Sequence, residues 1–379
     1  MRKPVSVFLG GVALSLFLAV WGVGPAAAQE TYKVGVTIPM SGPLGIWGDR
    51  LMNGMNIAAE EINAKGGIKG KKIELVYEDH KGDPNTGVAA YRKLVSVDKV
   101  PAVITIFTGI AFAQIPVADE TKTIIFSGGV QHPDFTKKSR WAFRNTTNAN
   151  QEIETVAEVA LRGLKKKRIA VLHVNDEVGR YYQETMERKT KELGGQIVVT
   201  DAYENAGTDF RSQLTKVKAA NPEILAILGT GTKALAQVVK QAAELGIKAQ
   251  ILSNSATEAA DLIDVAGKAA EGIIYAIPAF DPDSKDPLVV NFVKTYKERS
   301  GGKIPDNFAG SFHDAVKILA LAIEKGGYDA EKMRSVLLTI KDFPGVTGKT
   351  TFLPSGDSIK PITVRTIKDG KFVPYKGAL

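Results

Sequence analysis

The chain contains no cysteine, and histidine and tryptophan are scarce, with four and three copies in 379 residues. The lack of cysteine excludes disulfide bonds, thiolate metal sites and a lipid-modified cysteine at a processed N-terminus. The four histidines lie far apart in the sequence, at His80, His132, His173 and His313, so no zinc-ligand spacing is present. We therefore expect neither a metal nor any other cofactor.

The sequence also lacks a complete catalytic motif. It has no Gly-x-Ser-x-Gly elbow of a serine hydrolase. Residues 348–350 resemble the end of a phosphate-binding loop, but Phe343 stands where the first glycine is required. Gly229 and Gly231 hint at a dinucleotide-binding turn, but Ala234 replaces its third glycine. Residues 79–83 hold two aspartates and a histidine, which fit a polar loop capping the next helix better than an acid–base or metal site. We therefore expect a protein that is not an enzyme.

The first thirty residues have the three-part pattern of a secretory signal peptide. Arg2 and Lys3 precede an apolar stretch from Val5 to Val23, and the small residues Ala26 and Ala28 follow. A membrane anchor is the alternative, but glycines interrupt the apolar region and no basic cluster follows it. No later hydrophobic run approaches the roughly 20 residues that span a bilayer. We predict a signal peptide at 1–28 and a soluble periplasmic protein that is not a lipoprotein.

Charge is spread evenly along the chain. The 49 basic and 41 acidic residues give a formal net charge of +8. The only basic cluster is 165–168, and aromatic residues do not alternate with the basic ones. This distribution favours a solvated surface over a nucleic-acid-binding stripe. A length of 379 residues exceeds one typical core and indicates two domains.

Short β-rich runs alternate with helical patterns over most of the chain. Strands are predicted at 32–38, 72–77, 102–106 and 123–126, with helices at 51–62 and 86–96 and a further short helix between the last two strands. After a boundary at 141–146, the alternation restarts with strands at 168–174, 196–202, 223–228, 249–252 and 272–276 and helices at 151–164, 181–193, 209–220 and 233–245. Two helices at 287–300 and 307–325 follow with no strand between them, and a hairpin at 362–375 closes the chain. The pattern predicts two doubly wound, Rossmann-like α/β lobes with parallel sheets.

Residues 38–48, with the sequence Ile-Pro-Met-Ser-Gly-Pro-Leu-Gly-Ile-Trp-Gly, closely resemble the N-terminal signature of the leucine/isoleucine/valine-binding protein family. The resemblance continues through 61–70 and 79–84 and returns at 170–179, at Gly229 and at 270–272. Members of this family are type I periplasmic solute-binding proteins of ATP-driven importers. The resemblance implies two lobes joined by three crossovers, one lobe formed by 29–145 and 278–352 and the other by 146–277 and 353–379. It also implies a ligand in the cleft between the lobes, where strand ends and helix N-termini favour an anion.

Carried over position by position, the family's ligand contacts fall on both lobes. The aromatic wall falls on Trp47, and the groups that bind the ligand's carboxylate fall near Thr108 or Gly109 and on 127–131. In the second lobe, Val178 and Gly231 occupy the positions of two family tyrosines. Ser255 occupies the position of the family's acidic residue, which neutralises the ammonium of an amino acid. The expected ligand-binding residues are Trp47, Thr108, Gly109, Ser127, Gly129, Gln131, Asn175, Val178, Thr230, Gly231, Ser255 and Phe280.

The departures from the family pattern bear on the ligand. A buried ammonium without a counter-charge costs several kcal/mol, so Ser255 favours a ligand with an acid group and no α-ammonium, unless Asp176, Glu177 or Glu258 substitutes. Gly129 and Gly231 replace larger groups and are expected to widen the cleft. Trp47, with Phe107, Phe112 or Phe280, offers a stacking face for a flat ring. We expect an aromatic or other apolar carboxylate, with an aliphatic amino acid or small amide as the alternative.

The expected mechanism is a hinge that buries the ligand on closure. The closed form would then meet an inner-membrane ABC permease with its ATPase. We expect a monomer with no nucleic-acid partner. A sensor for a chemoreceptor or kinase, and an exported hydrolase on the same scaffold, stay open as alternatives. Individual residues also have plainer interpretations: Trp47 could plug the lobe edge, the phenylalanines could belong to the core, and Gln131 and Ser255 could face solvent.

Overall fold

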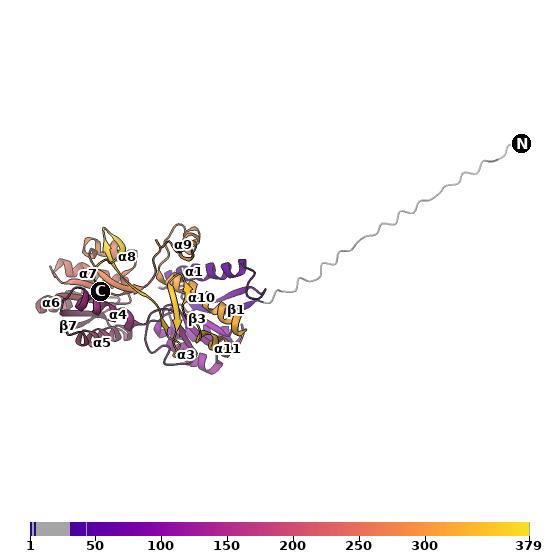
Figure 1. Cartoon of the computed structure of the whole chain (residues 1–379), viewed down its shortest axis with the longest axis horizontal. Coiled ribbons are helices and arrows are strands. Elements are labelled where there is room, and N and C mark those ends of the chain that lie inside the picture. Colours follow the sequence, from indigo (N-terminus) through magenta and orange to yellow (C-terminus); the bar gives the residue numbers. More distant parts are fainter. Residues whose placement is uncertain (2–3, 5–30, 43, 379) are drawn as a thin grey trace. The chain divides into compact units, whose positions relative to one another are not determined.

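The computed structural model describes residues 1, 4, 31–42 and 44–378. Apart from Met1 and Pro4, the predicted signal peptide and its cleavage site lie outside the described residues. Residues 31–379 form one compact unit. Within this unit, the elements gather into two α/β lobes (Figure 1). A search of the described helices finds none with the length and apolar character needed to cross a membrane.

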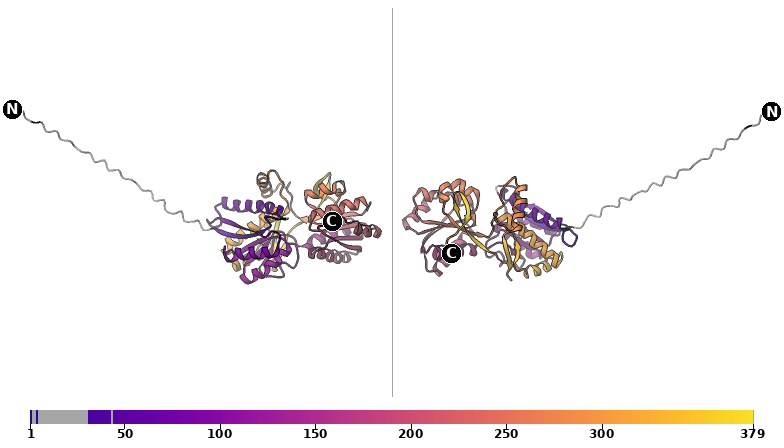
Figure 2. Two further views of the ribbon diagram at one scale, coloured as in Figure 1. Left: turned by 180° about the vertical axis from the view of Figure 1, so that it is seen from behind. Right: turned by 45° about the horizontal axis from the view of Figure 1, so that its top comes forward.

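The first lobe is built on a parallel sheet, which has five strands within the described residues, in the order β2-β1-β3-β4-β5. These strands are β1 (Tyr32–Ile38), β2 (Ile73–Asp79), β3 (Ala102–Thr105), β4 (Ile124–Ser127) and β5 (Ala142–Arg144). Its early helices are α1 (Ile46–Ala64), α2 (Pro84–Ser96) and α3 (Thr108–Thr121). Later parts of the chain add α9 (Pro287–Arg299), α10 (Asn307–Gly326) and α11 (Ala330–Leu337). The orange α10 packs along the indigo α1, so segments far apart in the sequence share this lobe (Figures 1 and 2).

Hydrophobic periodicity explains how this lobe forms. In β1, Val34, Val36 and Ile38 alternate and are fully buried, and in α1 the buried Leu51 and Met55 lie one turn apart. They pack in one cluster between the sheet and the helices α1 and α10. A second cluster fills the opposite face, beneath α2 and α3. Both faces of the parallel sheet are therefore covered, as such sheets require.

The second lobe is built on a mixed sheet with seven strands in the described part of the chain, in the order β15-β14-β10-β9-β8-β6-β7. Its parallel strands are β6 (Arg168–Val174), β7 (Gln196–Tyr203), β8 (Ile224–Leu228), β9 (Gln250–Ser253) and β10 (Ile274–Pro278). The predicted hairpin, β14 (Ile362–Lys368) and β15 (Lys371–Pro374), adds antiparallel strands at the edge. The helices are α4 (Ala149–Glu158), α5 (Glu177–Glu192), α6 (Arg211–Ala220), α7 (Thr232–Glu244) and α8 (Ala260–Ala266). The predicted architecture of two doubly wound lobes is confirmed.

Some local features differ from the sequence prediction. The helix expected at 151–164 changes after Glu158 into a π-helical turn, Val159–Gly163, in which the Leu164 amide donates to the Val159 carbonyl at 2.8 Å. Helix α11 was not anticipated, nor was a small antiparallel sheet of β11 (Phe343–Gly345), β12 (Gly348–Phe352) and β13 (Ser358–Ile359). These strands are too short to produce a clear alternating pattern.

The chain passes between the lobes after β5, after β10 and between β13 and β14. The first two passages follow Arg144 and Pro278, near the expected lobe limits at 145 and 277. The third lies at 360–361, beyond the expected limit at 352, because β13 pairs with β12 in the small sheet. Next to the first passage, Arg144 at the end of β5 donates from its Nε at 2.7 Å to Asp357, which lies in the turn just before β13. The lobe limits themselves stay a prediction.

Candidate ligand-binding site

A cavity of about 410 Å³ lies between the two lobes. Its walls come mainly from the loops that follow β3 and β4 in the first lobe and β6, β8 and β9 in the second. Open α/β sheets bind ligands at this end of their strands, and small-molecule sites commonly measure about 300–1,000 Å³. Among the residues expected from the sequence, those that line it are Trp47, Thr108, Gly109, Gly129, Gln131, Val178, Thr230 and Ser255.

An aromatic wall, formed by Trp47, Phe107 and Phe308, covers part of the first-lobe side. The Trp47 ring centroid lies 5.6 Å from that of Phe107 and 5.0 Å from that of Phe308, both in near-perpendicular arrangements. Edge-to-face packing of this kind holds aromatic rings in fixed positions. The sequence analysis missed Phe308, because α10 joins this lobe only through the tertiary fold. Phe112 is not part of the wall, and its ring packs 5.0 Å from that of His132.

Arg50 brings a positive charge to the same wall. It follows Trp47 by one helical turn on α1, and its guanidinium lies 4.5 Å from the Trp47 ring centroid. It also forms an ion pair with Asp306. Burial lowers the pKa of Arg50, but a guanidinium stays protonated in proteins. The sequence analysis missed this residue, although its i+3 spacing from Trp47 places both on one helix face.

The start of α3 faces the cavity with its first backbone amides. Phe107 precedes the helix with a φ of 68°, in the left-handed region that a bulky residue adopts only when the surrounding structure enforces it. No side chain of the described residues caps α3, and the first amides of a helix have no partner within it. A Cβ added to Gly109 would meet no heavy atom within 4 Å, so the space in front of it is open. This arrangement suits an anion.

Hydrogen bonds of the Ser127 hydroxyl shape the loop after β4. Ser127 is fully buried and does not line the cavity. Its hydroxyl donates to the Thr105 carbonyl at 2.8 Å and accepts from the amides of Gly129 and Val130 at 3.1 and 3.0 Å. These bonds fold the loop so that Gly129 and Gln131 face the cavity.

The second-lobe side consists of polar turns. Asp176 accepts from the Gly179 amide at 2.7 Å and so caps α5, which places Val178 at the cavity. Asn254 joins the turns after β8 and β9 through two hydrogen bonds to the Gly229 backbone, at 3.1 and 3.0 Å. Thr230 and Ser255 line the cavity from these turns. Few apolar side chains face the aromatic wall from this lobe.

Three other expected residues do not reach the cavity. Asn175 is exposed and donates to Glu204 at 2.6 Å. Phe280 is 4 % exposed and packs against Phe292 in a separate core cluster. Gly231 does not widen the cleft, because Asn205 Oδ1 lies 2.5 Å from the position that a Cβ would take. Gly129 does line the cavity, but an added Cβ would lie 3.2 Å from Ile106, so this glycine accommodates Ile106 as well as a ligand.

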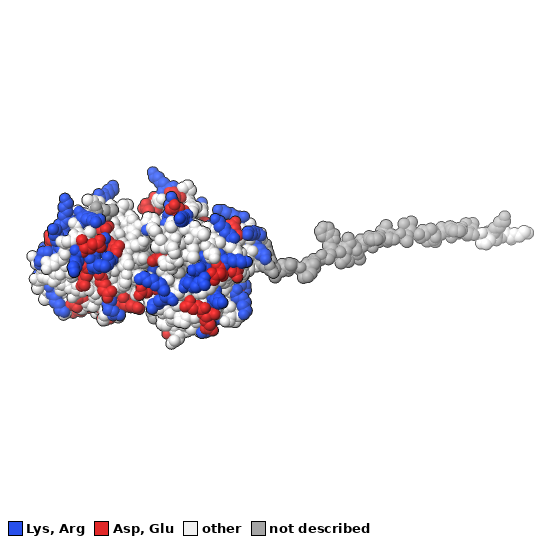
Figure 3. Space-filling model, turned by 60° about the horizontal axis from the view of Figure 1, so that its bottom comes forward, with Lys and Arg blue, Asp and Glu red and all other residues white. Residues whose placement is uncertain are grey.

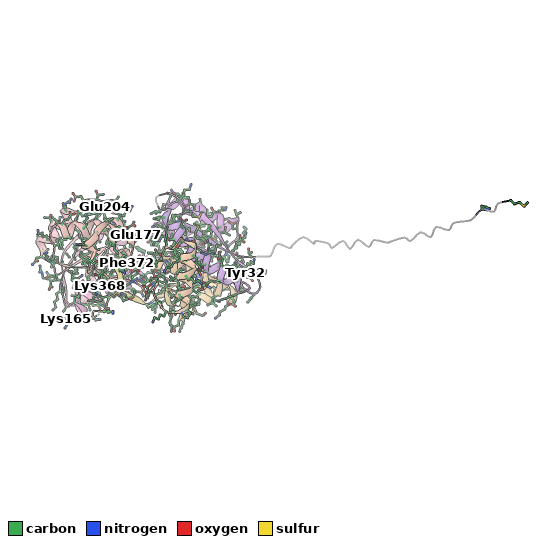
Figure 4. The ribbon with its side chains drawn as sticks, turned by 90° about the horizontal axis from the view of Figure 1, so that it is seen from above. Tyr32, Lys165, Glu177, Glu204, Lys368 and Phe372 are labelled. Carbon is green, nitrogen blue, oxygen red and sulfur yellow. The ribbon has the colours of Figure 1, made fainter. Side chains whose placement is uncertain are left out.

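Three carboxylates on the second lobe also line the cavity, and each already has a partner. Glu258 pairs with Arg365 at 2.5 Å and accepts from the Tyr275 hydroxyl at 2.5 Å. Burial raises the pKa of Glu258, against the opposing charge of Arg365. Glu177, at the edge of its lobe that faces the first lobe (Figure 4), lies 3.5 Å from His132 Nε2. Asp176 is the α5 cap described above.

The other sequence motifs behave as local structure. Asp83 caps α2 by accepting from the Thr86 amide at 2.7 Å, which confirms the capping interpretation of residues 79–83. The described residues contain no group of three metal-ligating side chains. On the face shown in Figure 3, basic and acidic side chains are interspersed.

Comparison with known proteins agrees with this architecture. A family model described as periplasmic binding protein matches residues 31–371. The chain is 27 % identical to the Leu/Ile/Val-binding protein homolog 1 of Brucella suis biovar 1 (strain 1330), over 95 % of each chain. The crystal structure of a leucine binding protein from Thermotoga maritima MSB8 is similar, with a TM-score of 0.83 and 27 % identity over 92 % of this chain and 98 % of that one.

A solute binding protein of an ABC transporter from Rhodopseudomonas palustris BisB5, in complex with 3,4-dihydroxy benzoic acid, has the same fold. Its TM-score is 0.80 at 22 % identity, over 92 % of this chain and 97 % of that one. The family match covers nearly the whole of the unit that carries the two lobes and their cavity. The chain therefore belongs to the periplasmic binding protein family, a family of binding proteins rather than enzymes, and within it to the Leu/Ile/Val-binding group of ABC-transporter solute-binding proteins.

Proposed function

We propose that this chain is the periplasmic receptor of an ABC importer and that it binds a small aromatic or other apolar carboxylate in the cavity between its lobes. The observation that carries the proposal is the pairing of an uncapped helix start with an aromatic wall on one lobe. The helix start suits the acid group, and the wall suits a flat apolar body. Neither feature alone would select this class of solute.

The solute's carboxylate would lie at the start of α3. There it accepts from the amides of Thr108 and Gly109, with the positive end of the helix dipole behind them. Its ring would then lie against Trp47, Phe107 and Phe308. Stacked or edge-on aromatic contacts contribute about 0.5–1.5 kcal/mol each beyond the buried area.

The charges of the second lobe argue against a ligand ammonium. Glu258 is neutralised by Arg365, Asp176 caps α5, and Glu177 lies beside His132. An ammonium in the cavity would have to compete with Arg365 for Glu258 or with the α5 amides for Asp176, or else reach Glu177, whose side chain is 59 % exposed. Without such a counter-charge its burial costs several kcal/mol. Ser255, at the position where the family resemblance implies an acid, offers only a hydroxyl and an amide.

The lobes would close on the solute as a hinge, because three separate chain passages connect them without a long flexible linker. Closure is favoured by the difference in solute affinity between the closed and open forms. The closed receptor would then deliver its solute to an inner-membrane permease. The similar fold that holds 3,4-dihydroxy benzoic acid supports an aromatic acid as a solute class for this scaffold.

The second candidate solute is an aliphatic amino acid. The leucine binding protein of similar fold, at 27 % identity, supports it. In that case one of the three second-lobe carboxylates must leave its present partner to meet the ammonium. Glu177 is the most exposed of them, with 59 % of its side chain accessible.

A thermal-shift panel tests the proposal. Purified protein is heated with benzoate, 3,4-dihydroxybenzoate, leucine, valine and a neutral benzamide. A solute present at about 100 times its dissociation constant stabilises the folded state by roughly 2.7 kcal/mol. Stabilisation by the aromatic acids, but not by benzamide, is the expected result. Stabilisation by leucine or valine alone would establish the second candidate instead, and uptake of the bound solute by cells with and without the gene separates transport from sensing.

A further inference from the structure

Glu152 is a buried carboxyl directly behind the cavity. It lies in the first turn of α4 and is fully buried. Its Oε1 accepts from the Gln131 amide and from the Thr147 hydroxyl at 3.0 Å, and its Oε2 accepts from the Ser255 backbone amide at 3.1 Å. The described residues provide no lysine, arginine or histidine within ion-pair distance of it. Glu152 is thus held by hydrogen bonds alone.

The partners of Glu152 belong to different lobes, and two of them line the cavity. Gln131 follows β4 of the first lobe, and Ser255 follows β9 of the second. The Gln131 side chain also accepts from the Tyr182 hydroxyl at 3.2 Å, and its Nε2 lies 3.5 Å from Ser255 Oγ. Both N–H groups of this amide therefore point toward Glu152 and Ser255, and a solute carboxylate would compete for them.

The elements packed against α4 do not neutralise Glu152. From α5, Tyr182 faces it with a hydroxyl whose pKa burial raises well above its usual value. From β10 and β14, Tyr275 and Arg365 are both engaged with Glu258. From the loop after β4, the pKa of His132 is lowered by burial, so its imidazole is neutral near pH 7.

The other charged residues that line the cavity have contacts of their own. Asp176 caps the start of α5, Glu177 lies beside His132, and Arg50 is paired with Asp306. In these surroundings, burial raises the pKa of Glu152 to about 7, although the hydrogen bonds from Ser255, Thr147 and Gln131 oppose the rise. Its charge is therefore open to change by the arrival of a charged solute.

We propose that Glu152 is the proton-linked positioning residue of this cleft: it holds Gln131 and Ser255 in place, and it takes up a proton from solvent when an anionic solute enters the cavity. This inference rests on the proposed function, since it requires that a charged solute bind there. The only covalent bond formed is the O–H of the Glu152 carboxyl. The proton from solvent offsets the negative charge of the solute, so the complex has the same net charge as the free protein. Protonation also frees the Gln131 amide to donate to the solute.

The sign of the linkage depends on the solute's charge. A nearby carboxylate disfavours ionised Glu152 and raises its pKa, so an acid binds more weakly as the pH rises above 7. A nearby ammonium has the opposite effect, so a zwitterionic amino acid would release a proton and bind more tightly as the pH rises. For an acid that keeps Glu152 protonated in the complex up to pH 8, affinity falls about fivefold between pH 7 and pH 8, because Glu152 of the free protein, with a pKa of about 7, ionises over that interval.

Calorimetric titration across pH 6.5–8.5 tests the inference, with 3,4-dihydroxybenzoate, benzoate and leucine as probes. Their carboxylates, with ordinary pKa values near 4, stay ionised throughout this range. Titrations in phosphate and in Tris, which differ in ionisation enthalpy, give the number of protons exchanged by the native protein. We expect an aromatic acid to bind with uptake of part of a proton near pH 7.5 and with the fall in affinity given above.

Glu152→Gln keeps the shape of the side chain and removes the titration, and it should bind the acid with no pH dependence in this range. Glu154→Gln is the matched control, because Glu154 lies on the same helix and pairs with the exposed Arg188. Binding by the native protein with no proton exchange, or an unchanged pH profile in Glu152→Gln, would overturn the inference and leave the proposed function intact. If none of the probes binds, the proposed function itself fails. If Glu152→Gln does not fold, the proton count of the native protein decides alone.

Discussion

Arg144→Met is expected to destabilise the protein strongly, because Arg144 is a buried cation that ties the end of β5 to the turn before β13. Its guanidinium is fully buried and donates to both carboxylate oxygens of Asp357, at 2.7 and 3.2 Å. It also donates to the carbonyls of Val130, His132 and Pro133, at 3.0, 2.8 and 3.2 Å. Methionine matches only the aliphatic part of the side chain and replaces none of these donors.

The magnitude follows from what the substitution leaves behind. Asp357, whose side chain is 12 % exposed, would keep only its hydrogen bond from Asn148 at 3.0 Å and its local backbone contacts. Removing one partner of a buried ion pair typically costs about 3–5 kcal/mol, because the other charge stays buried. The three carbonyls also belong to the loop that carries Gly129 and Gln131, so solute affinity should fall together with stability.

Urea unfolding followed by circular dichroism measures the loss as a shift in midpoint. Arg140→Met is the matched control: Arg140 pairs with Glu331 at 2.5 Å, both side chains are at least half exposed, and such a surface pair contributes about 0–1 kcal/mol. In Arg144→Met with Asp357→Asn, the second substitution should recover part of the loss, because it removes the unpaired charge. A loss below about 1 kcal/mol for Arg144→Met would refute this account of the buried ion pair.

Three further predictions concern the cavity and the first-lobe core. Trp47→Ala should weaken binding of an aromatic acid by about 10- to 100-fold, measured by calorimetry, because the ring loses its main apolar contact. Gly109→Leu should weaken binding at least about tenfold without changing the unfolding midpoint, because the new side chain enters open space in front of α3. Acid should destabilise the protein as the pH falls from about 4.5 to about 2. Burial raises the pKa of Glu61, but hydrogen bonds from His313 and Lys317 outweigh the effect of burial and lower this pKa to about 2. A carboxyl whose pKa is lower in the folded state stabilises that state at pH values above its unfolded pKa, and this stabilisation is lost as the pH falls towards its folded pKa. For Glu61 the loss in free energy of unfolding should be about 1–2 kcal/mol after solvent screening.

Each of these predictions has a control on the chain. Trp141→Phe changes a buried tryptophan outside the cavity and should leave affinity unchanged, so equal losses at Trp47 and Trp141 would contradict the aromatic wall. Gly109→Ala should have a smaller effect than Gly109→Leu if size is the cause. Glu61→Gln should flatten the acid dependence, and an unaltered curve would show that other carboxyls produce it.

The fold was predictable from the sequence because its signals are local. Alternation in β1 and the helical spacing of Leu51 and Met55 in α1 are visible without knowledge of the partner elements. The same holds for the hairpin at Asp369 and Gly370, both of which have positive φ as a tight turn requires. The π-helical turn after α4 and the small sheet of β11–β13 carry no such periodic signal.

The cavity was predictable only in part, because its residues come from loops joined by the tertiary fold. The family resemblance placed Trp47, Thr108 and Ser255 in the cleft, and all three line the cavity. Phe280 was expected there as an aromatic stacking partner of Trp47, but aromatic character alone cannot distinguish a cavity wall from the core around Phe292. Glu152 has no sequence signal at all, since a glutamate in the first turn of a helix is ordinary on any surface.

The comparison structures indicate where ligand choice resides in this scaffold. A leucine binding protein and a solute binding protein holding 3,4-dihydroxy benzoic acid both resemble this chain over about nine-tenths of its length, with TM-scores of 0.83 and 0.80. The fold therefore sets the place of the cavity, and a few loop side chains must set its occupant. In this chain those side chains divide by lobe: the first contributes the aromatic wall, Arg50 and the open start of α3, while Glu258 and Asp176 of the second are already engaged. Substitutions at Trp47 and Gly109 should consequently change which solute binds while leaving the buried Arg144–Asp357 pair intact.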